Sequence, residues 1–426
     1  RSEIYEDLLE AVYKRDWESG RNRNVGHLTL EDFVRILEEI GISTWHRDGR
    51  TTTIGIVHNR CKKSGLVHLL KTFQEGAEEG VGRLFAAFYF RQHGVQQDGT
   101  KTFEFTHKSF SEYLTAKRLV RALGRMYVEI QLRKDTYERG WDESDALSYW
   151  VEIYTNAPRI SADLIPFIRN EIALCDTDKT ALWQLMLCDL ISWLLKHGMP
   201  TLAPRQDYIV ENQIAVHAEE GLLALLNACA RVTQQVSRIN YFEENEFAAS
   251  IWLDRLCGKN MANTSTIFLN CVSYMSFKNC DLSSQRMFEA DLQSSDLSGA
   301  NLLGCNLMLA NLTDVNLSNA NLGTNFYRAI TTPRPRPFED YDPDDQYFIS
   351  EVKLGAFISI KSDLPWDKII EVVEGTSLTN LHEISLMEEP YLIEIDFIGV
   401  NLIGTRLPDG TLWHMGRDMS EFTDPT

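Results

Sequence analysis

The segment Ser295-Asp296-Leu297-Ser298-Gly299-Ala300-Asn301-Leu302-Leu303-Gly304 belongs to a stretch, from Ser265 to Thr324, that repeats with a period of five residues. A mostly small residue stands two positions before the centre of each pentad, and Asn or Asp lies between the two in most of the later repeats. The centres are Ile267, Val272, Phe277, Leu282, Met287, Leu292, Leu297, Leu302, Leu307, Leu312, Leu317 and Leu322.

A period of five fits neither the 3.6 residues of a helical turn nor the alternation of a plain strand. A four-sided coil does fit, because each pentad then forms one short side and every centre and small residue points inward. Successive coils would stack at strand spacing, about 4.8 Å, with backbone hydrogen bonds along the stack. Asn and Asp suit the corners, where their side chains bond to nearby backbone. The alternative is an amphipathic helix with coincidental spacing, whose apolar residues would drift around all faces.

These pentads resemble the pentapeptide-repeat family, whose pattern is a small residue, Asp or Asn, Leu and two free positions. The resemblance implies a right-handed quadrilateral β-helix. Twelve pentads make only three coils, and a repeat array cannot cover its own ends. We expect one further coil where the pattern resumes, with a cap after it and an inserted segment before it. The resumed centres are Leu392, Phe397, Leu402 and Leu407, and the capping residues are Leu412 and Trp413.

Length and charge limit the class of protein. The 426 residues allow about three domains, and the net charge of −19 argues against a nucleic-acid partner. The eight cysteines show no CxxC pair and no zinc spacing, so we expect reduced core residues in a cytoplasmic protein. We expect no membrane span, since the most apolar run, residues 181–195, is interrupted by polar residues and too short.

The first hundred residues alternate helical and extended patterns. Helices are expected over residues 3–15 and after Thr29, which can cap the second of them. The segment from Arg50 to His58 stays open between strand and loop. A strand over residues 86–92 and a strand-to-helix transition over residues 102–120 complete a pattern typical of a winged helix.

Within that transition, Phe105-x-His107-x-Ser109-Phe110-x-Glu112-Tyr113-Leu114-x-Ala116 resembles the F-x-H-x-[ST]-F-x-E-[YF]-x-x-A signature that follows the nucleotide-binding module of NACHT proteins. These belong to the STAND class of signal-transducing NTPases, which includes animal NLR receptors and bacterial defence proteins. The resemblance covers about residues 4–125. It implies that ATP or ADP with Mg²⁺ binds an upstream NTPase domain, because this chain contains no G-x-x-x-x-G-K-[ST]. We therefore expect no cofactor and no catalysis here, in what we take to be a fragment of a longer protein.

The remaining chain is expected to be helical up to the repeat. Breaks are expected at Pro158, Pro166, Pro200 and Pro204, and the resemblance implies a helical arm that couples the NTPase to its sensor. The insertion has α/β character, with a strand over Phe357–Ile360 and a helix over Pro365–Val373 that Asp363 caps. The predicted domains are a winged-helix-like region (1–125), a helical domain (126–260), the repeat (261–327), the insertion (328–389), the final coil and cap (390–413) and a tail (414–426).

Three candidate sites have competing interpretations. Asp340, Asp342, Asp344 and Glu351 are spaced like the ligands of a calcium loop, but Asp345 replaces the glycine of the sharp turn, which favours a solvated acidic loop. A packed histidine at the start of a helix is favoured over a catalytic role for His107. The resemblance places His46 near the phosphate of the bound nucleotide, and an exposed turn histidine is the alternative.

Together these patterns predict a sensor and regulatory part of a bacterial NLR-like NTPase in antiphage or stress surveillance. Its repeat would bind a protein ligand, such as a phage protein, and the resemblance implies that binding releases an autoinhibited form to oligomerise. The alternative is a pentapeptide-repeat DNA mimic that binds a topoisomerase, which usually has a much longer coil. A hydrolytic enzyme would need a nucleophile paired with a base, and no such motif is present.

Overall fold

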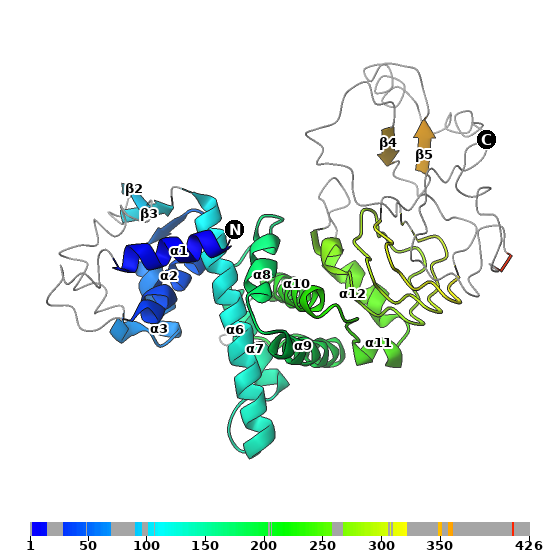
Figure 1. Ribbon diagram of the computed structural model, residues 1–426, viewed down its shortest axis with the longest axis horizontal. Coiled ribbons are helices and arrows are strands. Elements are labelled where there is room, and N and C mark those ends of the chain that lie inside the picture. Colours follow the sequence, from blue (N-terminus) through cyan, green and yellow to red (C-terminus); the bar gives the residue numbers. More distant parts are fainter. Residues whose placement is uncertain are drawn as a thin grey trace.

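Helices dominate the described chain, and the repeat lies at the opposite end of the molecule from the N-terminal elements (Figure 1). The computed structural model describes residues 2–14, 29–47, 49–69, 90–95, 101–105, 107–202, 205, 207–257, 267–305, 307, 310–321, 348–351, 357–360 and 411–412. The resulting architecture is mostly helical, with pentapeptide repeats toward the C-terminal end.

The elements follow in three groups. The N-terminal group comprises α1 (Ser2–Tyr13), α2 (Leu30–Trp45), β1 (Thr51–Thr53), α3 (Ile54–Lys63), β2 (Phe90–Val95) and β3 (Lys101–Phe105). The helices that follow are α6 (Lys108–Thr136), α7 (Glu143–Ile153), α8 (Leu164–Ala173), α9 (Thr177–His197), α10 (Tyr208–Thr233), α11 (Asn240–Glu244) and α12 (Ala248–Cys257). A short 3-10 helix, η2 (Ile267–Cys271), opens the repeat, and β4 (Phe348–Glu351) pairs antiparallel with β5 (Phe357–Ile360) further on.

The N-terminal sheet has the strand order β1-β3-β2, and both pairings are antiparallel. Phe103 at the centre of β3 lies opposite Thr52 on one side and Gln92 on the other. The strand predicted over residues 86–92 is confirmed from Phe90 as β2, and residues 86–89 lie outside the described residues. The chain thus brings together strands that are about fifty residues apart.

Local capping decides where the N-terminal helices begin. The Thr29 hydroxyl accepts a hydrogen bond from the Asp32 amide, and the Asp32 carboxylate accepts one from the Thr29 amide, as predicted for this cap. The segment that the sequence left open between strand and loop is instead a three-residue strand followed by helix α3. The helix starts there because the Thr53 hydroxyl accepts from the Ile56 amide.

Helix α6 is the central element of the first half of the chain. It runs 29 residues without a break and packs against α2 and α8, so the predicted domain boundary at residue 125 falls inside one helix. The α2 backbone comes very close to it at Gly41, where an added Cβ would lie 2.7 Å from Leu114 Cβ. One continuous helix, α6, therefore joins the N-terminal elements to the helices that follow.

The predicted helices over residues 146–153, 165–174, 181–195 and 214–232 all form, as α7 to α10. The sequence predicted a helix break at Pro166, but α8 continues through it, because Pro166 is the third residue of that helix. The first turn of a helix has backbone N–H groups without intrahelical partners, so a proline there removes no hydrogen bond.

The repeat returns to the same position every twenty residues. Parallel bridges join Ser276 to Asp296 and Asp296 to Asn316, with equivalent bridges on two other sides. We call each twenty-residue turn a coil. All the described centres from Val272 to Leu317 are buried, as predicted. The start of the repeat differs, because η2 spans Ile267–Cys271, and Asn270, the residue two positions before the centre Val272, is only half-buried.

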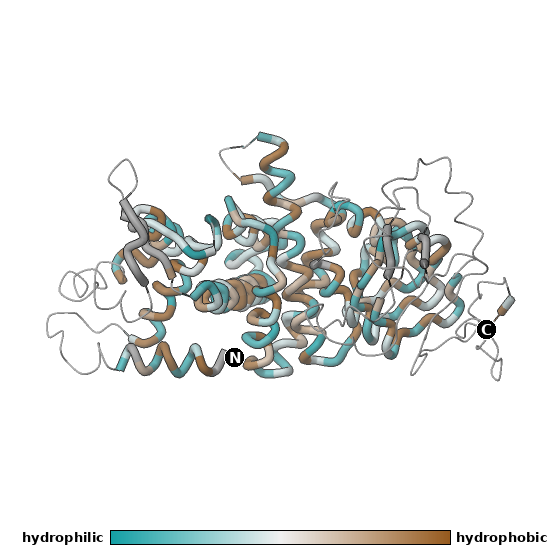
Figure 2. Tube along the Cα trace, turned by 90° about the horizontal axis from the view of Figure 1, so that it is seen from above, coloured by the Kyte–Doolittle hydropathy of each residue, from teal (hydrophilic) through white to brown (hydrophobic). Residues whose placement is uncertain are grey.

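One continuous hydrophobic core joins the N-terminal elements, the helices and the coils. Hydrophobic and hydrophilic segments alternate along both helices and coils, as expected for elements that bury one side (Figure 2). The predicted strand over Phe357–Ile360 is confirmed as β5. The predicted helix over Pro365–Val373 with its Asp363 cap, and the final coil apart from residues 411–412, lie outside the described residues.

Candidate functional site

The motif residues at the start of α6 collect in an aromatic cluster. Phe105, at the end of β3, lies edge-on to Phe110 with ring centroids 5.6 Å apart. Tyr5 from α1 packs on both Phe110 and Tyr113, at 5.7 and 5.1 Å, and Tyr113 also meets Phe167 from α8 at 6.4 Å. The motif therefore marks the place where α1, β3, α6 and α8 meet.

Polar residues of the motif extend this contact. The Glu112 carboxylate is almost fully buried and lies 2.9 Å from Lys108 Nζ, which also reaches Asp163 before α8 at 3.2 Å. The hydrogen bond to Glu112 is the main reason that the pKa of Lys108 is raised. The Tyr5 hydroxyl donates to Ser109 Oγ at 2.9 Å. These bonds fix the start of α6 against its neighbours.

His107 begins α6, as predicted, but it does not pack beneath the two phenylalanines. It is the N-cap residue of α6, its side chain is exposed and it makes no side-chain cap hydrogen bond. The nearby Ser109 hydroxyl accepts a hydrogen bond from Tyr5, which belongs to the contact between α1 and α6.

His46 caps the C-terminal end of α2 and is half-buried, so it is not an exposed turn histidine. Its Nε2 lies 2.7 Å from the carbonyl oxygen of Ile153 at the end of α7. Burial, together with the nearby Arg60 guanidinium, lowers the pKa of His46 to about 3. The ring is therefore neutral at physiological pH, and its Nε2 ties α2 to α7.

A buried charge cluster beside the motif was missed by the sequence analysis. Glu39 Oε1 accepts from Arg118 Nε at 2.7 Å and from the Ser64 hydroxyl at 2.6 Å, and its Oε2 lies 3.4 Å from Arg60 Nε. Burial alone would raise the pKa of Glu39, but the two guanidinium groups and the hydroxyl lower it. The sequence did contain a signal for this cluster, because Glu39 in α2 and Arg118 in α6 each lie among apolar residues of their helix.

The base of the repeat is built partly from the helices before it. Ser237, after α10, forms a parallel bridge with Met275, donating to Tyr274 O at 2.7 Å and accepting from Ser276 N at 2.9 Å. The Asp281 amide likewise donates to Glu246 O at 2.8 Å. Backbone from the α10–α12 segment therefore occupies the row beneath the first coil on two of its sides.

Polar side chains complete this junction on a third side. Arg169 of α8 donates to Asn270 O at 2.8 Å and to Asn227 Oδ1 at 3.0 Å. Asn227, buried in α10, in turn donates to Ser273 O at 3.1 Å. Arg231 of α10 pairs with Asp291 in the next row. The helices thus cap the open end of the coils, as the sequence led us to expect, and also bind them with directional contacts.

The outside of the coils carries a ladder of Asp and Asn. Each of these side chains accepts a hydrogen bond from the amide two residues on, such as Asp296 Oδ1 from Ser298 N at 3.0 Å, which confirms the predicted bonds to nearby backbone. They stand at the bridged positions of the sides, however, and not at the left-handed corners where they were predicted. Asp281, Asp291 and Asp296 belong to one coil, and the residues stacked on them are Asn301, Asn311 and Asn316. These three asparagines donate to the aspartates beneath them, at 3.0–3.3 Å.

The corner two residues after each centre has a left-handed backbone. Asn279, Ser284, Glu289, Ser294, Asp314 and Asn319 all have φ between 55° and 60°. Glycine takes the same corner in two pentads, and at Gly299 a Cβ would lie 2.2 Å from Asn279 Oδ1 in the coil below. A regular corner therefore accounts for the five-residue period.

No group of three or more potential metal-binding side chains occurs among the described residues. Asp340, Asp342 and Asp344 lie outside them, as does the side chain of Glu351 in β4. All eight cysteines are free thiols, six of them buried, and burial raises the pKa of Cys61 and Cys305 to about 12. Within the described ranges, no helix is both long and apolar enough to cross a membrane.

Comparison with known proteins identifies the repeat. The family model for pentapeptide repeats matches residues 286–324 as eight copies. No curated protein and no solved structure matches the chain significantly. The pentads, their buried centres and their twenty-residue stacking agree with this family, whereas the helical part has no match.

Proposed function

We propose that this chain is the sensor and regulatory part of a bacterial NLR-like NACHT NTPase, in which the repeat binds a protein ligand. The observation that carries the proposal is the junction. Arg169, Asn227 and Ser237 join the base of the coils to α8 and α10, and α8 packs directly on the motif helix α6. A structural change in the coils on ligand binding therefore reaches the motif through packed elements, without a flexible linker between them.

The fold proposed for the repeat is a right-handed quadrilateral β-helix. Its support is the twenty-residue bridge spacing together with the left-handed corner two residues after each centre from Val272 to Leu302 and after Leu312 and Leu317. For the N-terminal part we propose a winged helix. The order helix, strand, helix, strand, strand and the sheet order β1-β3-β2 support it, because these place the last two strands as a hairpin beside the first.

In this proposal the nucleotide, with Mg²⁺, belongs to an upstream NTPase domain, and this part carries no reaction. His46 is the residue that the resemblance places near the phosphate. Its neutral ring and its bond to Ile153 O favour a positioning role through α2 over direct charge compensation. Activation would then involve release of α6 and α2 from their neighbours, followed by oligomerisation. The eight free cysteines support a cytoplasmic location.

The topoisomerase-binding alternative requires a surface that imitates the regular charge of DNA. The carboxylates of the ladder are confined to one coil, because the coil stacked on it carries Asn at the same positions. Since a DNA mimic needs negative charge along its length, this distribution favours the sensor proposal.

The proposal is tested by affinity capture with the whole chain as bait, from phage-infected and uninfected bacterial lysates. We expect a phage protein in the infected sample only. A variant in which residues 327–389 are replaced by a short linker shows whether the insertion takes part. Recovery of gyrase from both lysates, without a phage protein, would instead support the topoisomerase alternative.

A second measurement tests the coupling itself. Captured ligand should change amide hydrogen exchange in α8, at the junction with the coils, and at the start of α6 beyond it. In the variant Arg169→Ala/Asn227→Ala, the ligand should still bind while this change is lost. An unchanged exchange pattern in α6 on ligand binding to the natural chain would contradict a regulatory role.

A further inference from the structure

One outer side of the repeat differs from the others in composition. We call it the 281 side, which consists of residues 281–285 in one coil and 301–305 in the next. Its rows are joined by Ser284 N donating to Leu303 O at 2.9 Å. The row beneath is Glu246, whose carbonyl accepts from Asp281 N, and Phe247 follows it at the start of α12.

Three large apolar side chains are exposed along this side and the helix below it. Phe247 is 49 % exposed, Ile251 is 63 % exposed and Leu303 is 46 % exposed. Ile251 lies one helical turn after Phe247, since its amide donates to Phe247 O at 3.0 Å. We call these three residues the apolar patch. Small residues, Ser283, Ser284 and Gly304, stand at the other outward positions after the centres of the 281 side.

Of the two neighbouring sides, the one with residues 276–280 is polar at the equivalent outward positions, Lys278, Ser298 and Ser318. The other neighbouring side carries Phe288, which is 36 % exposed, whereas the opposite side is polar, with Gln293 and Thr313. The pentad pattern does not restrict these positions. Exposed apolar side chains that gather on one part of an otherwise polar repeat are typical of an interaction surface.

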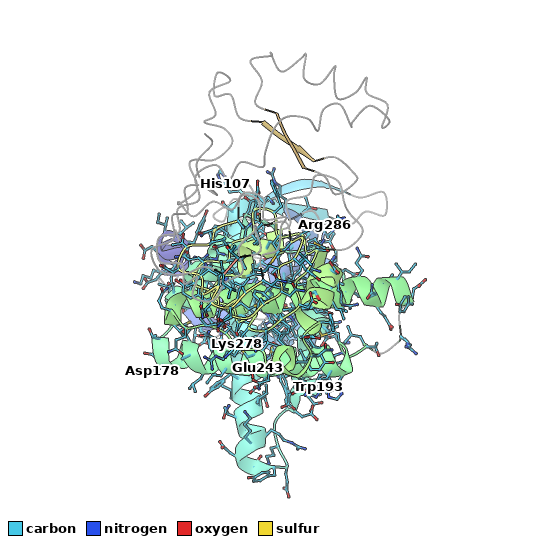
Figure 3. All side chains as sticks on the ribbon, turned by 90° about the vertical axis from the view of Figure 1, so that its right-hand side faces the viewer. His107, Asp178, Trp193, Glu243, Lys278 and Arg286 are labelled. Carbon is cyan, nitrogen blue, oxygen red and sulfur yellow. The ribbon has the colours of Figure 1, made fainter. Side chains whose placement is uncertain are left out.

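The rim of the apolar patch is acidic. Glu243, Glu246 and Asp254 are exposed around it, and Asp281 is half-buried at its edge. Hydrogen bonds from Ser283 lower the pKa of Asp281, so that carboxylate stays ionised at neutral pH. Figure 3 views the repeat end of the molecule and labels Lys278 and Arg286 of the coils and Glu243 of α11.

The nearest basic residues of the helices are already paired. Arg255 of α12 binds the buried Glu219 at 3.0 Å, and Lys196 of α9 binds Glu244. Lys278 and Arg286 are exposed on the two flanking sides, so the four carboxylates outnumber these two cations around the apolar patch. An apolar surface with an excess of carboxylates around it fits a partner whose apolar anchors are flanked by Lys or Arg.

We propose that the apolar patch binds a cationic amphipathic protein segment, with Phe247, Ile251 and Leu303 as its contacts and the acidic rim selecting its charge. This inference rests on the proposed function, because it narrows the protein ligand of the repeat to one chemical class and one side. The apolar contacts supply most of the affinity, and the rim supplies the salt dependence.

The test uses the whole chain and two labelled synthetic peptides with the same helical pattern, one of Leu and Lys and one of Leu and Glu. Fluorescence anisotropy should show binding of the Leu/Lys peptide only. The variant Phe247→Ser/Ile251→Ser/Leu303→Ser should bind it at least about tenfold more weakly, a loss that more than 1.4 kcal/mol of contact energy produces. All three side chains are exposed, so the fold should persist, as circular dichroism will check.

The matched control is Leu174→Ser/Leu182→Ser/Leu185→Ser, which removes three apolar side chains of similar exposure, 51 %, 47 % and 64 %, from the α8–α9 region. It should leave peptide affinity unchanged. Equal losses in both variants, or equal binding of the Leu/Glu peptide, would overturn the proposal. If the patch variant still captures a phage protein, the assignment of binding to the apolar patch is wrong but the proposed function stands. If the natural chain binds the Leu/Lys peptide but captures no protein from lysate, the result counts against the proposed function alone.

Discussion

Replacing Asn316 by aspartate should set two carboxylates against each other on the outside of the repeat. Asn316 Nδ2 donates to Asp296 Oδ1 at 3.0 Å, while Asn316 Oδ1 accepts from Ser318 N at 3.1 Å. Aspartate can keep the second bond but has no donor for the first. The variant Asn316→Asp therefore exchanges a hydrogen bond for a repulsion without changing the shape of the side chain.

The magnitude follows from the distance and the surroundings. Two unit charges 4 Å apart repel by about 1 kcal/mol in water and by about 4 kcal/mol at the effective dielectric of pairs near a protein surface. The lost hydrogen bond adds about 1 kcal/mol. Because both side chains are half-buried, we expect the free energy of unfolding to fall by about 2–4 kcal/mol at neutral pH. Repulsion raises the pKa of the pair, so the loss should shrink as the pH falls through that raised value.

Urea denaturation followed by circular dichroism measures the effect. Asn319→Asp is the charge-matched control, because Asn319 is exposed at a corner, and it should cost far less. The exchange variant Asp296→Asn/Asn316→Asp restores a donor and an acceptor and should recover most of the stability. Equal losses for Asn316→Asp and Asn319→Asp, or no recovery in the exchange variant, would refute the ladder as a source of stability.

Leu297→Ala, at a fully buried centre, should lower the free energy of unfolding by about 2–5 kcal/mol, whereas Leu303→Ala should change it by less than about 1 kcal/mol; denaturation midpoints compare the two. Gly221→Ala would place Cβ 1.9 Å from Tyr154 Oη, and we expect a loss of about 1–3 kcal/mol that Tyr154→Phe partly relieves in thermal melts. The pKa of His46 is lowered from 6.5 to about 3, so the unfolded chain binds the proton more tightly and His46 reduces stability as the pH falls from 6.5 toward 3. Its ring signals in NMR should not titrate between about pH 5 and 8, and a midpoint near 6 would contradict the buried geometry.

The aromatic cluster at the motif illustrates how far sequence could lead to a candidate site. Phe105, Phe110 and Tyr113 were singled out by their spacing, and they do lie together. Their partners Tyr5 and Phe167 come from helices about a hundred residues before and fifty after, and no local pattern connects these segments. His107 shows the opposite case, since its side chain is exposed at the start of α6 although packing was expected.

The pentad pattern by itself determined the coils. A buried centre, a small neighbour and a corner in every five residues are local requirements, and each pentad repeats the residue types that meet them. Helix positions followed in the same way from apolar spacing and caps such as Thr29. These features need only neighbours in the chain.

Only the tertiary structure decided how the repeat begins and what lies beneath it. Ser237 and Glu246 bind the first coil through their backbone N–H and C=O groups. Because nearly every residue carries these groups, no side-chain pattern could have predicted the contacts. The ion pairs of Glu39 and Arg231 likewise depend on where distant helices meet. The exposed patch at Phe247 and Leu303 was hidden for the same reason, because residues 56 positions apart become neighbours only after the coils have stacked.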